Sequence, residues 1–160
     1  IDNDIQAISS TFNEAKGSMF LGRGFSYPIA LEGALKLKEL AYVHAEGYPA
    51  GEMKHGPLAL IEEGMPVVVI APRDEHYKKT ISNMQEVISR GAKVLLITNK
   101  STDEIYSENI WEQIEVDAIS DELIPFLTTI PLQKLAYYSA LDKGYDIDKP
   151  RNLAKSVTVE

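Results

Sequence analysis

The first part of the chain has a helical spacing of hydrophobic residues. Apolar side chains recur there every three or four positions, which places them on one face of an α-helix. The pattern predicts an amphipathic helix that ends before Gly17. Its apolar positions are Ile1, Ile5, Ile8 and Phe12.

Four short apolar runs follow, and each predicts a buried strand. They occupy residues 19–21, 66–71, 94–97 and, more weakly, 114–116. Runs of this length that are rich in Val, Ile and Leu are typical of parallel strands covered on both faces.

Helical patterns separate these runs. We expect helices over about residues 27–43, 75–90 and 123–142, with Ser26 as the N-cap of the first. Pro131 predicts an interruption or a kink in the last helix. Strands that alternate with helices predict an α/β fold with a doubly wound parallel sheet, which binds ligands at the carboxyl ends of its strands.

The composition narrows the class of protein. A chain of 160 residues with 44% hydrophobic and 25% charged residues is typical of one globular domain. A net charge of −8 argues against nucleic-acid binding, which needs a basic surface. No apolar run is long enough to cross a membrane. The lack of cysteine excludes disulfides, thiolate metal sites and a cysteine nucleophile. A cytoplasmic location fits these properties, and the first residue, Ile1, suggests a piece of a longer polypeptide.

Three charged residues share one stripe of the helix after the first strand. At 100° per residue, Glu32, Lys36 and Glu39 fall within about 60° of one another. The ordinary interpretation is a solvated face with an i,i+4 Glu–Lys pair. The helix taken alone favours that interpretation over a catalytic one.

The stretch 47–57 contains three glycines and two prolines, so we expect a loop with at most one helical turn. His55 lies in it, and histidine is the usual proton carrier near neutral pH. A loop histidine is nonetheless more often a surface residue than a catalyst. The other histidines, His44 and His76, are interpreted as structural or exposed, and the spacing of the three offers no metal site.

Two further features have competing interpretations. Gly22-Arg23-Gly24 follows a strand and precedes a helix, so its N–H groups could bind an anion, but a tight turn is the favoured interpretation. Lys155 near the end of the chain is an ordinary surface charge unless it is buried beside a carbonyl substrate. There it could form a Schiff base, because burial lowers the pKa of an amine.

Long stretches of the chain resemble one enzyme family, both in their residues and in the order in which they occur. The chain is similar to the carboxy-terminal half of the isomerase region of the glutamine–fructose-6-phosphate aminotransferases, also called glucosamine-6-phosphate synthases. The resemblance implies the sugar isomerase (SIS) fold, a five-stranded parallel sheet flanked by helices. The matching stretches are GRG from Gly22, EGALKLKE from Glu32, HAEGYPAGEMKHGPLAL from His44 and DKPRNLAKSVTVE from Asp148.

The resemblance implies a role for five residues. Glu39 matches the base that moves a proton between C1 and C2 of the open-chain sugar, and Lys155 matches the lysine that forms a Schiff base at C2. His55 matches the histidine that opens the sugar ring, which in this family comes from the partner subunit. Lys36 matches a lysine close to the base, and Ala154 lies beside the sugar. We expect neither a cofactor nor a metal ion.

Two parts of the family's machinery have no counterpart here. The amino-terminal cysteine that releases ammonia from glutamine is missing, and no Ser-Gln-Ser-Gly-like loop is present to hold the sugar phosphate. We therefore expect residues 1–16 to be a linking helix after a missing SIS half, residues 17–144 to be a SIS domain, and residues 145–160 to be a catalytic tail.

The resemblance also implies partners. They are fructose 6-phosphate, glucosamine 6-phosphate and a second copy of the chain, with neither nucleic acid nor membrane. Alternatives are a related SIS enzyme that acts on a fructosamine phosphate, a SIS sensor of sugar phosphates that regulates a DNA-binding partner, and a purely structural module. The AKSVTVE ending favours the synthase over the first alternative.

Overall fold

The computed structural model describes residues 2–99, 109–117 and 120–151. Within these residues, five strands form one parallel sheet in the order β2-β1-β3-β4-β5. The chain first pairs β1 with β2 on one side and then returns to pair β1 with β3, so the sheet has its switch point between β1 and β3. The strands are β1 Ser18–Gly22, β2 Ala45–Pro49, β3 Pro66–Ile70, β4 Lys93–Thr98 and β5 Glu112–Glu115.

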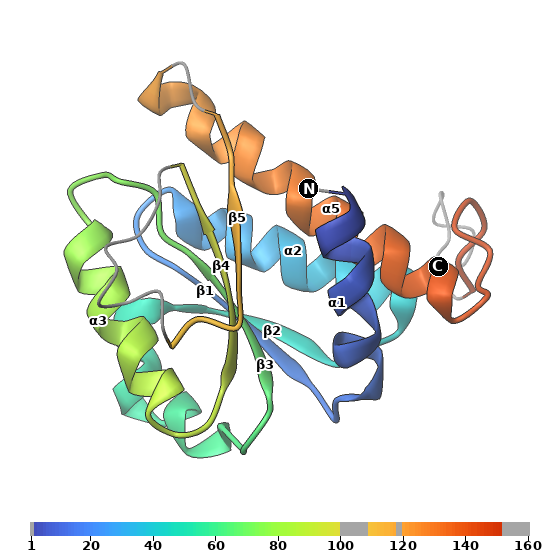
Figure 1. The fold of residues 1–160 in the computed structure, drawn as a ribbon, viewed down its shortest axis with the longest axis horizontal. Coiled ribbons are helices and arrows are strands. Elements are labelled where there is room, and N and C mark those ends of the chain that lie inside the picture. The colour runs from blue at the N-terminus through green and yellow to red at the C-terminus, as the bar shows by residue number, and fades with distance from the viewer. Residues whose placement is uncertain (1, 100–108, 118–119, 152–160) are drawn as a thin grey trace, which may run out of the picture.

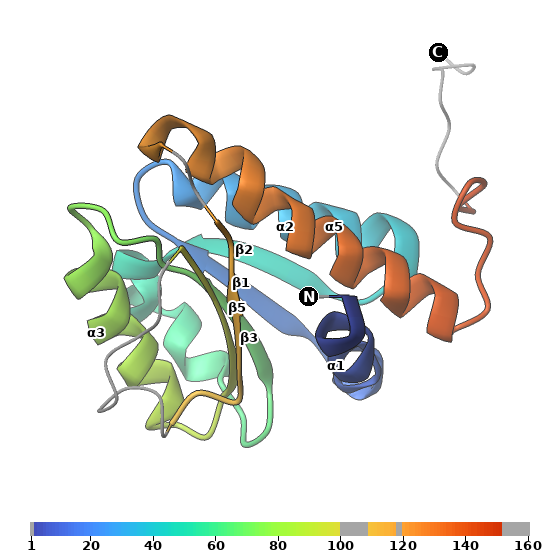
Figure 2. The same cartoon turned by 45° about the horizontal axis from the view of Figure 1, so that its top comes forward.

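Two layers cover the sheet (Figure 1). One layer holds α1, α2 and α5, and the other holds α3 with the short 3₁₀ helices η1 and η2, as the tilted view also shows (Figure 2). A further 3₁₀ turn, η3, leads into α5. The helices are α1 Asp2–Glu14, α2 Ser26–Ala41, η1 Ala50–His55, η2 Pro57–Leu60, α3 Tyr77–Ile88, η3 Asp121–Leu123 and α5 Ile124–Asp142.

Alternation along the central strands explains the two cores. Successive side chains point to opposite faces, so Val68 and Ile70 pack toward α2 and α5 while Val67 and Val69 pack toward α3. All of β3 is buried, as continuous β-branched runs predict. The expected α/β fold with a doubly wound, five-stranded parallel sheet is confirmed.

The strand that the hydrophobic pattern did not predict is β2. Its sequence, Ala-Glu-Gly-Tyr-Pro, has one large hydrophobic residue, and we had expected a loop from Gly47 onward. β2 lies at the edge of the sheet, where it pairs with β1 alone, and an edge position tolerates polar residues, Gly47 and Pro49. The loop expectation holds only after β2, where η1 and η2 form two short helical turns.

The expected N-cap of α2 is wrong, and so is the expected interruption of α5. Ser26 is the first residue of α2 rather than its N-cap, and no side chain caps this end. The backbone N–H of Ser26 instead donates to the carbonyl of Arg23 at 2.9 Å, which tightens the first turn. Pro131 does not interrupt α5, which continues as one helix from Ile124 to Asp142.

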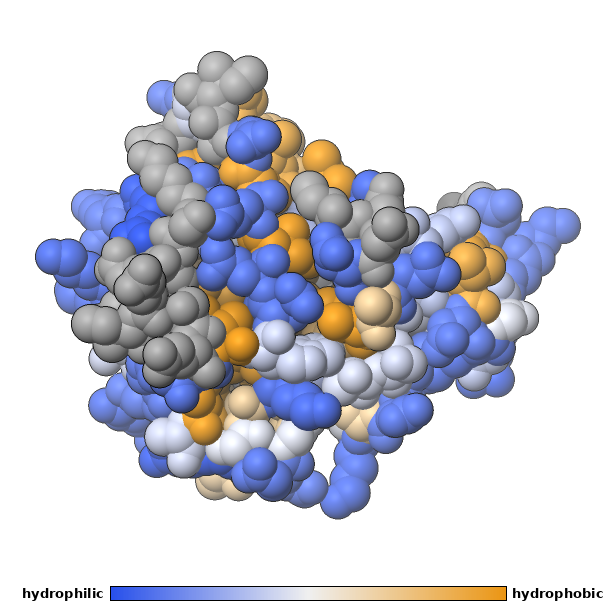
Figure 3. Space-filling view, in the orientation of Figure 1, coloured by the Kyte–Doolittle hydropathy of each residue, from blue (hydrophilic) through white to orange (hydrophobic). Residues whose placement is uncertain are grey.

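Helix α5 carries apolar side chains on its outer side as well as its inner one. Phe126 is 72% exposed, and Ile130, Tyr137 and Leu141 are also exposed. Figure 3 shows orange, apolar patches among blue, hydrophilic residues on this face of the molecule. A helix that is apolar all round is typical of a helix covered on both sides in a larger assembly.

Candidate active site

Glu39 lies near the C-terminal end of α2, far from the carboxyl edge of the sheet. Helix α2 begins at Ser26, just after β1 ends, and runs back toward the start of β2. Thirteen residues separate Ser26 from Glu39, which at 1.5 Å per residue is about 20 Å along the helix axis. The predicted base is therefore on the side of the amino ends of the strands, whereas the fold class predicts a ligand at their carboxyl ends.

An ion pair holds the carboxylate of Glu39. The Nζ atom of Lys36 donates a hydrogen bond of 2.6 Å to Glu39 Oε2, and it lies 3.7 Å from Glu32 Oε1. The side chain of Glu39 is 22% exposed, so the pair is half-buried and open to solvent on one side. The hydrogen bond to Glu39 raises the pKa of Lys36, with Glu32 adding to the effect and partial burial opposing it. Lys36 thus stays protonated beside the carboxylate.

Close packing fixes the helix that carries this pair. Gly33 lies where a Cβ atom would meet the side chains of Leu132 and Phe20 at 2.8 and 3.0 Å. Gly47 of β2 lies where a Cβ atom would be 2.9 Å from the Cα atom of Leu31. Both glycines let backbones approach closely, so α2 lies tightly against the sheet and against α5.

His55 has very different surroundings. It is the last residue of η1, its side chain is 75% exposed, and its Nε2 atom lies 3.8 Å from Glu52 Oε2. Its helix is held from the inner side, where Met53 is buried, and by an ion pair of 2.9 Å between Lys54 Nζ and Glu86 Oε1 of α3. The imidazole is therefore presented outward on an anchored turn.

Glu39 and His55 belong to elements on opposite faces of the sheet. Leu37 of α2 packs in the core with α1 and α5, whereas Met53 of η1 packs in the core with α3. Within the part of the chain that is described, the recorded ion pairs of Glu39 and His55 stay inside their own helices. The chain does not bring these two predicted site residues together.

The Gly22–Gly24 segment is a tight turn. A Cβ atom at Gly22 would come within 2.2 Å of the carbonyl oxygen of Ser26, and Gly24 has φ +53° with the ring of His76 against it. The guanidinium group of Arg23 lies against Gly51. Both glycines are thus needed for the path of the backbone, in agreement with the favoured interpretation.

A cavity of about 920 Å³ lies beside this turn, at the switch point of the sheet. Among the described residues, its lining includes the acidic side chains Asp74, Glu75 and Glu122 but no lysine or arginine. An acidic lining disfavours a phosphate group. The cavity does not include Glu39 or His55.

Two predicted site residues, Lys155 and Ala154, lie outside the described residues. The described chain ends at Arg151, whose backbone N–H donates to the hydroxyl of Tyr42 just beyond the end of α2. Tyr42, three residues after Glu39, is not among the predicted site residues. Its left-handed backbone conformation, with φ 54°, has no signature in a tyrosine, so the sequence offered no signal for it.

The described part of the chain has neither a cluster of metal ligands nor a membrane-spanning helix. The described ranges 2–99, 109–117 and 120–151 hold no group of three or more His, Asp and Glu residues arranged for a metal ion. No helix within those ranges has the length and apolar character needed to span a bilayer.

A parallel α/β domain with these features matches a known family. The SIS domain model matches residues 11–142, and the chain belongs to this family. The chain is also 52% identical, over all 160 residues, to the glutamine–fructose-6-phosphate aminotransferase [isomerizing] of Bartonella henselae, of which it covers 26%. It is 52% identical over 157 residues to the enzyme of the same name from Aquifex aeolicus, again covering 26% of it. The chain thus spans about a quarter of the length of these relatives.

Solved structures agree with the sequence relatives. The C-terminal domain of glucosamine-fructose-6-phosphate aminotransferase from Francisella tularensis superimposes with a TM-score of 0.82 at 48% identity. The match covers 92% of this chain and 42% of that one. A glucosamine-6-phosphate deaminase from Thermotoga maritima matches with a TM-score of 0.68 at 27% identity, covering 98% of this chain and 46% of that one.

Proposed function

We propose that this chain supplies the base and the imine-forming lysine of an enzyme that converts fructose 6-phosphate into glucosamine 6-phosphate. The ammonia comes from glutamine, which a different part of the polypeptide hydrolyses. The observation that carries this proposal is the half-buried carboxylate of Glu39, held at 2.6 Å by Lys36 on a tightly packed helix. The names of the relatives and the identity over the whole chain support it.

The proposed chemistry divides among three residues. His55 transfers the proton that opens the sugar ring, and the amine of Lys155 condenses with the C2 carbonyl, which releases water and forms an imine. Ammonia then replaces the lysine amine at C2. Glu39 removes a proton from C1 and delivers it to C2. This transfer leaves an aldehyde at C1 and an amine at C2. Because the oxidation of C1 is balanced by the reduction of C2, the reaction needs no redox cofactor.

Lys36 and Ala154 have supporting roles in this proposal. The ammonium group of Lys36 orients the Glu39 carboxylate through its hydrogen bond and provides a donor for the sugar hydroxyls. Ala154 lies beside the sugar in the tail that we assign to residues 145–160. Residues 17–144 form the domain that carries the base, and residues 1–16 form the helix that links it to the preceding part of the polypeptide.

A second copy of the chain completes the site. Glu39 and His55 lie on elements that the sheet separates, and His55 is exposed, so His55 serves the active site of a partner subunit in a homodimer. The exposed apolar side chains of α5 support an assembly larger than this domain. The phosphate of the substrate binds to a part of the polypeptide outside this chain, and the enzyme works in the cytoplasm.

Reduction of the imine tests the proposal in the full-length polypeptide. Borohydride with fructose 6-phosphate should attach the sugar to Lys155, and mass spectrometry of the peptides locates the label. Lys155→Arg keeps the charge but cannot form an imine, so labelling should vanish. Glu39→Gln removes the base alone, so labelling should survive while turnover falls about 10²–10⁴-fold.

A matched control comes from the same helix. Lys38 is exposed and outside the Glu32–Lys36–Glu39 stripe, so Lys38→Arg should leave both labelling and turnover unchanged. Near-normal turnover of Glu39→Gln, or a label on Lys36 in place of Lys155, would overturn the assignment.

A further inference from the structure

The segment that follows α5 folds back onto the C-terminal end of α2. The backbone N–H of Arg151 donates a hydrogen bond of 2.6 Å to the hydroxyl of Tyr42. The guanidinium carbon of Arg151 also lies 4.2 Å from the centre of the Tyr42 ring, which is a cation–π contact. One tyrosine therefore binds both the backbone and the side chain of a residue 109 positions later in the chain.

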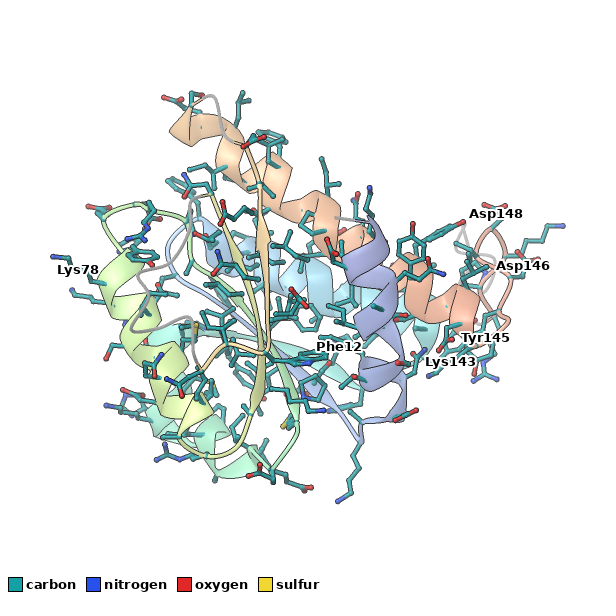
Figure 4. All side chains as sticks on the ribbon, viewed as in Figure 1. Phe12, Lys78, Lys143, Tyr145, Asp146 and Asp148 are labelled. Atoms are coloured by element: carbon teal, nitrogen blue, oxygen red, sulfur yellow. The ribbon has the colours of Figure 1, made fainter. Side chains whose placement is uncertain are left out.

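Two more residues complete this contact. The rings of Tyr42 and Tyr145 lie 4.9 Å apart, and the guanidinium carbon of Arg151 is 5.9 Å from the Tyr145 ring. Lys143 Nζ donates a hydrogen bond of 2.9 Å to the carbonyl of Ala41, the last residue of α2. Figure 4 shows Lys143 and Tyr145 close together beyond the end of α5. We refer to Tyr42, Lys143, Tyr145 and Arg151 as the tyrosine clamp.

Local hydrogen bonds shape the segment between Tyr145 and Arg151. The carboxylate of Asp146 accepts from the backbone N–H groups of Asp148 and Lys149 at 3.0 and 3.1 Å. These bonds form a turn that sends the chain back toward α2. The path from α5 to Arg151 is thus held by contacts at both of its ends.

The backbone of Tyr42 is itself specialised. Tyr42 ends α2 in the left-handed conformation, with φ 54° and ψ 34°, and it is the one non-glycine residue with positive φ among those described. Glycine or asparagine is the usual residue at such a position. Tyrosine is unusual at such a position, and in this structure its side chain binds Arg151.

We propose that the tyrosine clamp positions Lys155 beside Glu39 during imine formation, an inference that rests on the proposed function. Arg151 precedes Lys155 by four residues, which span at most about 14 Å when fully extended. Tyr42 follows Glu39 by three residues, a rise of about 4.5 Å on a helix. Fixing Arg151 to Tyr42 therefore limits the distance between the amine and the base. The clamp residues act through Lys155 and do not touch the substrate.

A positioning role predicts a lower kcat with little change in KM. The clamp raises the fraction of time that the amine spends within reach of C2, so its loss should slow imine formation. The phosphate site lies elsewhere in the polypeptide, so KM for fructose 6-phosphate should change less than threefold. A purely structural role would instead lower the midpoint of unfolding and leave the rate of the folded enzyme unchanged.

Two truncations in the full-length polypeptide test the clamp. Tyr42→Ala and Arg151→Ala should each slow the borohydride-trapped labelling of Lys155, by about 10²-fold for the first and about tenfold for the second. Tyr42→Phe keeps the ring and loses only the hydroxyl, so it should slow labelling about threefold. Arg151→Lys keeps the positive charge and should restore part of the rate that Arg151→Ala loses. Arg90→Ala removes an exposed arginine just after α3, in the opposite layer, and should have no effect.

Trypsin cleavage after Arg151 provides a readout that does not depend on activity. The hydrogen bond and the ring contact with Tyr42 restrain the backbone at Arg151, so Tyr42→Ala should be cut there about tenfold faster than the wild type while urea unfolding shows a folded protein. Arg151→Ala has no trypsin site at this position, but if Tyr42→Ala fails to fold its labelling rate still tests the clamp, because it leaves α2 unchanged. Wild-type labelling rates in the folded Tyr42 and Arg151 variants, or a wild-type cleavage rate in the folded Tyr42 variants, would overturn the clamp. No label on Lys155 in the wild type would instead overturn the proposed function, and this outcome is distinguishable because the cleavage assay still reports on the clamp.

Discussion

The end of α2 and the η1 segment each carry one of the proposed catalytic groups, and they hold them in opposite ways. On α2, the carboxylate of Glu39 is bound by Lys36 and mostly shielded by its own chain. On η1, His55 is three-quarters exposed and its only recorded ion-pair partner among the described residues is Glu52, at 3.8 Å. The first group is positioned by its own chain, whereas the second extends away from it.

This difference supports the proposed division of the active site between two molecules. A base must be rigid relative to the carbon that it deprotonates, and a close-packed helix provides that rigidity. A side chain that serves a neighbouring subunit must instead project from an anchored turn. The sheet between the two elements prevents them from meeting inside one chain.

Mixing two inactive variants would test this division most strongly. Glu39→Gln and His55→Asn in the full-length polypeptide should each lose about 10²–10⁴-fold in turnover. When the two are co-expressed, half of the dimers pair unlike subunits at random, and each such dimer has one intact site out of two. Activity should then return to about one quarter of the wild type.

The control for this experiment mixes Glu39→Gln with Lys155→Arg. We assign both residues to the same subunit, so neither site of a mixed dimer is intact and this mixture should stay inactive. A mixture of His55→Asn with Lys155→Arg should instead return about one quarter of the wild-type activity, because we assign these two residues to different subunits. If Glu39→Gln with His55→Asn stays inactive, His55 acts within its own chain and the comparison between the two regions fails.

Gly47 links the two regions, and enlarging it should loosen α2. A Cβ atom there would meet backbone atoms of Leu31 at 2.9 Å, and backbone cannot move aside cheaply. We expect Gly47→Ala to lower the free energy of unfolding by about 1–3 kcal/mol, measured by urea unfolding. Gly17→Ala meets only ordinary contacts at 3.4 Å and should change stability by less than about 0.5 kcal/mol. Equal effects of the two substitutions would argue against close packing at Gly47.

Tyr48 precedes η1, and its hydroxyl donates to the carboxylate of Glu46. This hydrogen bond, followed by burial, raises the pKa of Tyr48. Tyr48→Phe should lower the free energy of unfolding by about 0.5–1 kcal/mol at neutral pH, measured by urea unfolding. Because the folded protein favours the protonated phenol, this contribution is present below the unfolded pKa of about 10 and is lost as pH rises through the higher folded value. A stability difference that grows above pH 10 would contradict this assignment.

The smallest expected effect concerns the charge beside the base. Lys36→Met removes the ion pairs with Glu32 and Glu39. It should lower the free energy of unfolding in urea by about 0.3–0.5 kcal/mol near pH 7. The pKa of Lys36 is raised in the folded protein, so the contribution is complete below the unfolded value of about 10.4 and declines only above it. Lys38→Met is the control, because Lys38 is exposed on the same helix. A difference that disappears between pH 6 and 9 would show that another group is responsible.

The hydrophobic pattern predicted the interior of the fold better than its edge. Strands β1, β3 and β4 occur where apolar runs predicted them, because buried parallel strands require such residues on both faces. The other edge strand, β5, has one buried residue and only partly overlaps the weaker run at 114–116. Strand β2 has no such requirement on its open side, so glycine and proline within it indicated a loop. The five-strand expectation came from the family resemblance and not from the pattern.

The candidate site was predictable in part. The spacing of Glu32, Lys36 and Glu39 correctly predicted a shared stripe, since helical geometry alone determines it. Periodicity could not distinguish a solvated stripe from a site, and the roles of these residues stay predictions. Neither could the sequence reveal the contact between Tyr42 and Arg151, which depends on a left-handed tyrosine and on the long return of the chain after α5.

The packing of α1 against α5 determines the order in which the chain can fold. Asn13 of α1 donates to the carbonyl of Ser139 and to the carboxylate of Asp142, at 3.0 and 2.9 Å, across more than 120 positions of sequence. We therefore expect the layer around α3 to form once β4 has been synthesised, whereas the layer that holds Glu39 also needs α5. Contacts between distant segments of the sequence form slowly. The half of the molecule that carries the proposed base is therefore the last to be completed.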